Sequence, residues 1–248
     1  MNARPSGPRV ADPLAAAARF ATSVPGQILL NTAAFTLPEE LRIRPEWRVL
    51  DISCGRAALI RVVADRAGLS GLTVGLDPSR PLLTRGRRDM QLEGGPAIRL
   101  VQGAAATLPF ASDSLDLLLA GHAFRLLPDE DVLACLREAR RVLKPGALLL
   151  AWEFAPTQSQ RLDGWNRWLL SRREPVPRLR SYRELRGLAL TAAFDWVEQA
   201  HLRPFLFPPI PRVSLIVGKA PAGWRQRVID GRRVLQFMPG DAAPSETR

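Results

Sequence analysis

The stretch from Trp47 to Ile60, WRVLDISCGRAALI, decides the fold that this sequence predicts. An apolar run ends at the carboxylate of Asp51, a turn follows at Gly55, and an apolar helical pattern begins after it. This order is typical of a buried strand that leads through a tight turn into a helix. A second apolar run, LTVGLD at residues 72–77, also ends in an aspartate, 26 residues after the first. Because neighbouring parallel strands end at the same edge of a sheet, the two acids are expected to line one ligand crevice.

Strand and helix patterns alternate along the middle of the chain. Strands are predicted at residues 48–52, 73–77, 98–103, 114–120 and 147–154, with helices at 57–67, after Ser79, from 128 to about 143, and at 181–192. Such alternation predicts an α/β fold with a doubly wound, Rossmann-like sheet that is mostly parallel. Two last strands, at 194–202 and 213–219, are separated only by a proline-rich loop and can pair as an antiparallel hairpin, which makes seven strands.

Three segments follow from this pattern. Residues 1–40 are predicted as an N-terminal tail with helices, residues 41–220 as the α/β domain, and residues 221–248 as a C-terminal tail. A single α/β domain of this size can bury a full core.

Composition narrows the class of protein and its compartment. Hydrophobic residues make up 46% of the chain, and its two cysteines offer no disulfide framework. No run approaches the roughly 18 apolar residues that a membrane-spanning helix needs, and the N-terminus has no long apolar segment of the secretory type. We therefore expect a cytoplasmic protein without a transmembrane segment. The sequence does not predict an oligomeric state.

The net charge of +11 comes almost entirely from arginine, since the chain has only two lysines. The arginines are densest between Arg161 and Arg186. Such a run is most often a solvated face, and its alternative is a surface that attracts an acidic substrate, RNA or anionic lipid. Few aromatic residues interleave with it, apart from Trp165, Trp168 and Tyr182, so nucleic acid is the less favoured partner.

Five blocks, in order, resemble the class I S-adenosylmethionine-dependent methyltransferases, in particular the branch with quinone-biosynthesis C-methyltransferases. These blocks are VLDISCG at 49–55, GLDPS at 75–79, GAAATLPF at 103–110 with SLD at 114–116, LREARRVLKPG at 136–146, and VSLIVG at 213–218. The resemblance implies S-adenosylmethionine as cofactor, no metal, and methyl transfer to a small or acidic acceptor.

The resemblance also assigns cofactor-binding roles to eight positions. They are Asp51, Ser53, Gly55, Asp77, Pro78, Ala104, Ala105 and Gly121. The carboxylate of Asp77 can accept hydrogen bonds from both ribose hydroxyls, and Asp51 would face the cationic methionine end of the cofactor. The alternative is that the two acids only cap the helices that follow them.

A nicotinamide dinucleotide is the competing cofactor for such a fold. Its fingerprint, GxGxxG directly after the first strand, lets backbone N–H groups hold a pyrophosphate. Residues 53–58, SCGRAA, contain a single glycine, and the neighbouring Asp51 would repel phosphate. The sequence therefore favours S-adenosylmethionine.

Several positions depart from the family pattern. Ser53 and Ala57 stand where glycines are usual, and Ala104 stands where an aspartate often accepts a hydrogen bond from the adenine amino group. Arg56 replaces a small residue and is expected to point to solvent or to an acidic group of the second substrate. These departures support a second hypothesis, a degenerate domain that binds a partner instead of catalysing. An RNA methyltransferase is the third, although AGHA at 120–123 lacks the signature for base N-methylation.

Few residues are candidates for acid–base chemistry. Methyl transfer from a sulfonium depends mainly on alignment, and a base is needed only if the acceptor must lose a proton. His122, just after the fourth strand, is the candidate catalytic base, and its alternative is a capping or buried structural histidine. His201 is expected to be structural. Glu153, at the end of the fifth strand, faces either the acceptor pocket or a solvated turn.

Five further side chains are considered, one arginine, one cysteine and three tryptophans. Arg125 could pair with an acidic acceptor. Cys54 is expected to be a packed thiol, since nothing nearby would make it a thiolate. Trp152, Trp165 and Trp168 either line an acceptor pocket or pack in the core.

Overall fold

A computed structural model describes residues 43–157, 159–170, 178–200, 211–221, 223–229 and 232–237. The predicted N-terminal segment at residues 1–40 and His201 lie outside these ranges. Within the described part of the chain, no helix is long and apolar enough to cross a bilayer.

The predicted seven-stranded sheet is confirmed, in the order β3-β2-β1-β4-β5-β7-β6. Its strands are β1 Val49–Ile52, β2 Thr73–Asp77, β3 Arg99–Gln102, β4 Leu115–Gly121, β5 Leu143–Phe154, β6 Trp196–Gln199 and β7 Arg212–Gly218. The first five run parallel, whereas β7 is antiparallel to both β5 and β6. The strand β5 begins earlier than predicted, because α5 passes directly into it at Leu143 without a turn at residues 144–146.

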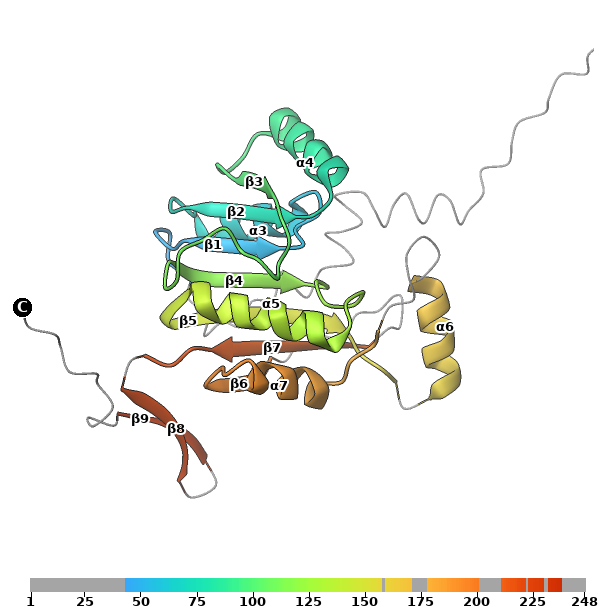
Figure 1. The fold of residues 1–248 in the computed structure, drawn as a ribbon. Coiled ribbons are helices and arrows are strands. Elements are labelled where there is room, and N and C mark those ends of the chain that lie inside the picture. The colour runs from blue at the N-terminus through green and yellow to red at the C-terminus, as the bar shows by residue number, and fades with distance from the viewer. Residues whose placement is uncertain are drawn as a thin grey trace, which may run out of the picture.

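Helices cover both faces of the sheet (Figure 1). They are α3 Ala58–Ala67, α4 Arg80–Glu93, α5 Asp129–Val142 and α7 Tyr182–Thr191, while α6 Gln160–Leu170 lies beyond the end of the sheet. Alternate residues of each strand point to opposite faces. Leu117 and Leu119 of β4 belong to the core under α3, whereas Leu118 and Ala120 belong to the core under α5 and α7.

The stretch predicted as a C-terminal tail contains two strands, which the sequence analysis did not predict. β8 Trp224–Ile229 and β9 Arg232–Phe237 pair as an antiparallel hairpin outside the main sheet. The sequence did contain a signal for it, because Asp230 and Gly231 separate the two runs and Asp-Gly is a preferred two-residue hairpin connection.

Because β1, β2, β4 and β5 run parallel, their carboxyl ends meet at one edge of the sheet, which we call the carboxyl edge. Asp51 and Asp77 lie there on β1 and β2, and Gly121 and Glu153 lie there on β4 and β5. The arrowheads of these strands point towards the side of the molecule on which α6 lies (Figure 1).

Candidate active site

Asp51 and Asp77 lie close together at the carboxyl edge, as the sequence predicted. The register pairs Asp51 with Gly75, so Asp77 lies two residues further along the neighbouring strand. Asp51 is only 1% exposed, and one of its oxygens, Oδ2, has no hydrogen-bond partner among the described residues. Burial and then the nearby Asp77 raise the pKa of the Asp51 carboxyl, an effect that a backbone N–H at Ile60 partly offsets. The site therefore presents a desolvated acid that a cation would stabilise.

Asp77 joins the two turns that follow β1 and β2. Its Oδ2 accepts a hydrogen bond from the Gly55 N–H at 2.8 Å, and its Oδ1 accepts one from the Ser79 N–H at 2.8 Å. Ser79 is the N-cap residue of α4, but its side chain makes no capping bond. Asp77 therefore makes one of the hydrogen bonds that the helix-capping interpretation predicts, because it binds the N-cap residue of α4. Each of its oxygens still has a second lone pair for another donor.

The turn between β1 and α3 follows a backbone path suited to glycine. Ser53, Gly55 and Ala57 all have left-handed φ values, of 57°, 57° and 64°. These are the positions at which the family pattern has glycine, although only Gly55 is one here. The left-handed region costs roughly 1–2 kcal/mol for a residue with a Cβ. A Cβ built on Gly55 would meet nothing within 4 Å, so the space above the turn is open.

Arg56 and Cys54, the other members of this turn, face the protein itself. Arg56 donates to Asp89 of α4, with Nε 2.8 Å and a terminal nitrogen 2.6 Å from Oδ2. The prediction that Arg56 points to solvent or to a second substrate was therefore wrong, because α4 supplies its own acid. Cys54 is buried as predicted, and burial together with the charges of Asp51 and Asp77 raises the pKa of its thiol.

The loop after β3 is held against Asp77 and α5. Its first residue, Gly103, donates a backbone hydrogen bond to the Asp77 carbonyl at 3.2 Å. Further along, the N–H of Leu108 donates to Glu138, and Arg141 donates to the carbonyls of Leu108 and Phe110. Glu138 and Arg141 are an ion pair at 2.7 Å, and the arginine holds the pKa of the glutamate below its usual value.

Three predicted cofactor residues lie on these loops with only small or apolar side chains. Ala104 and Pro78 are exposed, and Ala105 is half-buried. None of the three carries a side-chain hydrogen-bonding group, so only backbone groups can bind a polar ligand there. Gly121 has a packing role, since a Cβ at this position would lie 2.7 Å from the ring of Trp152.

His122 and Glu153 come together at the ends of β4 and β5. Glu153 is 1% exposed, so the alternative of a solvated turn was wrong. Its Oε1 accepts from the Phe124 N–H at 2.6 Å, and its Oε2 lies 3.8 Å from Nδ1 of His122. The imidazole stacks on Phe154, with ring centroids 4.1 Å apart. Within the described ranges, Oε2 and both ring nitrogens have no hydrogen-bond partner.

Burial lowers the pKa of His122, and the charges of Arg212 and Arg125 lower it further, while Glu153 opposes them. The imidazole is consequently neutral at pH 7 and has a lone pair that can accept a proton. Arg125 also donates to the backbone carbonyl of His122 at 3.0 Å, which fixes the turn that carries the ring.

Unpaired buried polar atoms thus gather at the carboxyl edge. They belong to Asp51, His122, Trp152 and Glu153. Buried polar groups are nearly always hydrogen-bonded in folded proteins, and exceptions call for a ligand, water or function. These atoms make the carboxyl edge the candidate binding site for a polar or charged molecule.

The sequence analysis missed one residue that shapes the site, Arg180. It was counted within the arginine-rich run, most of which was expected to be a solvated face, but it is 4% exposed. It donates to the carbonyls of Phe124 and Leu127 and to Asp129, and so anchors the loop after β4. Spacing alone did not distinguish it from its exposed neighbours Arg178 and Arg183.

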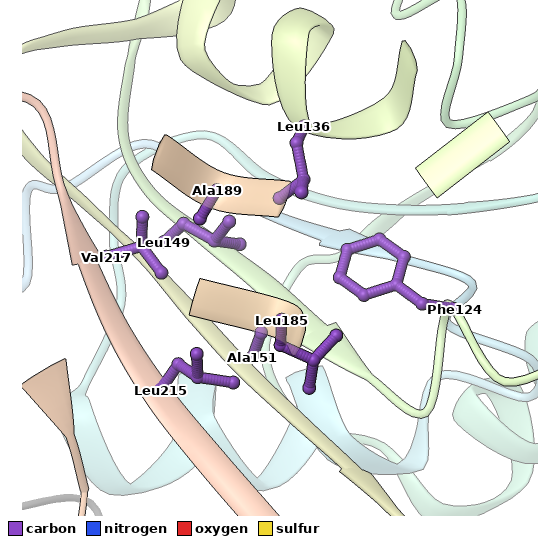
Figure 2. Close-up of a pocket in the computed structure, with 8 residues that line it drawn as sticks. All are labelled: Phe124, Leu136, Leu149, Ala151, Leu185, Ala189, Leu215 and Val217. Atoms are coloured by element: carbon purple, nitrogen blue, oxygen red, sulfur yellow. The ribbon is translucent and has the colours of Figure 1, made fainter. Parts of the chain in front are cut away.

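A small hollow lies between α5, α7 and strands β5 and β7 (Figure 2). All its lining residues are apolar: Phe124, Leu136, Leu149, Ala151, Leu185, Ala189, Leu215 and Val217. Without a polar group it can fix neither the orientation nor the charge of a ligand, so it is a gap in core packing.

Comparison with known proteins agrees with this geometry. Residues 49–146 match the family model described as a methyltransferase domain. Demethylmenaquinone methyltransferases from Bacillus velezensis and Bacillus subtilis are 37% and 35% identical over 113 residues, which is 46% of this chain and 48% of each relative. The chain therefore matches about half the length of these relatives.

Solved structures show the same fold. The YcgJ protein of Bacillus subtilis has a TM-score of 0.57 at 24% identity, over 71% of each chain. A SAM-dependent methyltransferase from Aquifex aeolicus has a TM-score of 0.59 at 14% identity, over 82% of this chain and 97% of that one. Residues 49–146 therefore resemble a methyltransferase domain, and the chain shares the fold of solved S-adenosylmethionine-dependent methyltransferases.

Proposed function

We propose that the protein transfers a methyl group from S-adenosylmethionine to a small acceptor at the carboxyl edge. The observation that carries the proposal is the buried Asp51, whose Oδ2 has no hydrogen-bond partner in the described structure and which lies beside Asp77 and the open turn at Gly55. An acid in this state favours a cationic ligand, and the cofactor is cationic at its methionine end.

The residues present fit the cofactor in three respects. The free lone pairs of Asp77 can accept the ribose hydroxyls, since each oxygen uses only one for the protein backbone. Asp51 can accept the ammonium group of the methionine moiety. The turn at residues 53–57 keeps its glycine-type path, so its backbone can approach the ligand.

The bound cofactor supplies an activated methyl group, so the protein mainly has to align the acceptor with it. His122 is placed to take a proton from the acceptor, because its ring is neutral and lies at the end of β4, the hydrogen-bonded neighbour of β1. Glu153 would accept a hydrogen bond from Nδ1–H of His122 after a small approach from 3.8 Å, which leaves the lone pair of Nε2 to act as the base. The burial of both groups limits competition from water.

The acceptor is the finer part of the proposal. The relatives named above are demethylmenaquinone methyltransferases, so demethylmenaquinone is the first acceptor to assay. Chain segments after β4 and β5 would select the acceptor, and such loops diverge among relatives more than the strands that carry them.

Calorimetric titration with S-adenosylhomocysteine, the demethylated cofactor, tests the proposal. The Asp77→Ala variant should bind it at least about tenfold more weakly, equivalent to ~1.4 kcal/mol, because the acceptor of two ribose hydroxyls is removed. Asp116→Asn is the matched control, since Asp116 lies at the amino end of β4 and pairs with Lys144.

If the folded wild-type protein shows no binding at millimolar ligand, the cofactor assignment fails. The alternative of a degenerate, non-catalytic domain, which the loss of an acidic side chain at position 104 favours, then replaces it.

A further inference from the structure

The helix α6 buries two polar side chains and exposes three large apolar ones. Asp163 and Asn166 are 7% and 3% exposed. On the same helix Leu162 is 55% exposed, Trp165 55% and Trp168 49%. The expectation that tryptophans pack in the core is therefore wrong for Trp165 and Trp168. Large apolar side chains gathered on one exposed face indicate an interaction surface.

The exposed residues form one continuous strip. Leu162, Trp165 and Trp168 follow each other at intervals of three, which places them within about 120° around the helix axis. The two tryptophan rings contact each other, with centroids 5.2 Å apart and planes inclined by 35°. At 100° per residue, Arg161 falls between Trp165 and Trp168 around the axis, whereas Arg167 lies about 160° from Trp165. We call the strip together with Arg161 the α6 face.

Charge on the α6 face is of one sign. Arg161, the charged residue of this face, is exposed. The sole carboxyl group between residues 159 and 168 belongs to Asp163, which is buried and accepts the Thr157 N–H at 2.6 Å. An outward side that is apolar and cationic complements a surface that is apolar and anionic.

We infer that the α6 face docks on an anionic lipid bilayer. Tryptophan rings favour the boundary between lipid headgroups and acyl chains, and arginines bind the anionic headgroups while their stems lie on the apolar side. Single-stranded RNA fits the strip less well, because Leu162 offers no stacking surface and the rings lean on each other. A second copy fits less well too, because symmetric pairing would bring the arginines of both copies together.

The position of α6 gives this docking a consequence beyond the proposed function. The helix lies on the side towards which the parallel strands end (Figure 1). A protein bound through the α6 face would hold its carboxyl edge near the lipid surface. Docking itself needs neither cofactor nor catalysis, so it can be true or false independently of the proposed function.

Co-sedimentation of the full chain with vesicles tests the inference. Vesicles of phosphatidylcholine with 30% phosphatidylglycerol (about a third anionic lipid) are compared with phosphatidylcholine alone. Wild-type protein should partition at least about tenfold better onto the anionic vesicles, with a blue shift of tryptophan fluorescence. The double variant Trp165→Ala/Trp168→Ala should lose about tenfold of the anionic binding. The control Trp224→Ala, an exposed tryptophan of β8, should not.

Charge reversal separates docking by the α6 face from a general effect of net charge. Arg161→Glu should lower the preference for anionic vesicles about tenfold. Arg85→Glu makes the same change of charge on an exposed position of α4 and should retain most of the binding. Equal losses in the two variants would overturn the inference. So would tighter binding to a single-stranded RNA oligomer than to vesicles, or a concentration-dependent dimer that both tryptophan substitutions dissociate. Circular dichroism of each variant verifies that it is folded.

Discussion

The carboxyl edge and α6 reverse the usual rule of burial in opposite directions. At the carboxyl edge, Asp51, His122 and Glu153 are buried with atoms for which the described structure provides no hydrogen-bond partner. On α6, Trp165 and Trp168 are large, apolar and about half exposed. Soluble proteins tolerate either feature only at a cost, so each indicates a partner that completes it. We expect a polar or cationic ligand at the first and an apolar surface at the second.

The largest effect is expected at the polar site, from His122→Gln. With an acceptor that loses a proton and that the wild-type protein methylates, kcat should fall by about 10²-fold or more. Because the pKa of His122 is lowered, the wild-type rate should rise with pH below 6.5 and then level off, and the variant should lack this rise. A rate-against-pH profile of both proteins measures this.

Asp116→Asn is again the control for the His122 experiment, since it lies at the other end of β4. An unchanged rate and pH profile in His122→Gln would show that the histidine is structural, as its alternative interpretation holds.

A smaller effect is expected from Asp51→Asn, and its sign depends on pH. The folded-state pKa of Asp51 is raised, so its carboxyl contributes full stability below the unfolded value of about 4 and loses it as pH rises through the folded value. The asparagine side chain of the variant does not ionise, so the variant does not lose this stability as the pH rises. At pH 7.5 the variant should unfold with a higher free energy than the wild type, and at pH 4 the two should agree.

Urea unfolding at both pH values measures this difference. The same variant should bind S-adenosylmethionine more weakly, because the partner of the cationic methionine end is lost. A gain in stability without a loss in affinity would contradict the assignment of Asp51 to that end of the cofactor.

The smallest effect is expected on α6. Replacing a core tryptophan typically costs 3–5 kcal/mol, whereas Trp165→Ser/Trp168→Ser should change the free energy of unfolding by less than about 1 kcal/mol. Urea unfolding without lipid measures it. A loss of several kcal/mol would mean that the pair supports the fold, and the contrast between the two regions would disappear.

Much of the carboxyl edge could be predicted from the sequence. The alternation of strands and helices determines a parallel sheet, and parallel strands that end in Asp51 and Asp77 must bring these residues to the same edge. The antiparallel pairing of β6 and β7 could be expected because the sequence between them is short and proline-rich, which disfavours a helical crossover. The hairpin of β8 and β9 could also have been predicted, because the dipeptide Asp-Gly separates the two runs in the sequence.

Other features were decided by the tertiary structure alone. The left-handed turn at Ser53 and Ala57 exists because β1 and α3 must be joined in a few residues, whatever their side chains. The arginine-rich segment contains both the buried Arg180 and the exposed Arg167, and α6 buries Asp163 while exposing Trp165. A sequence specifies the spacing of side chains on a helix, but which face is buried depends on the surface it meets, and distant segments of the chain form that surface.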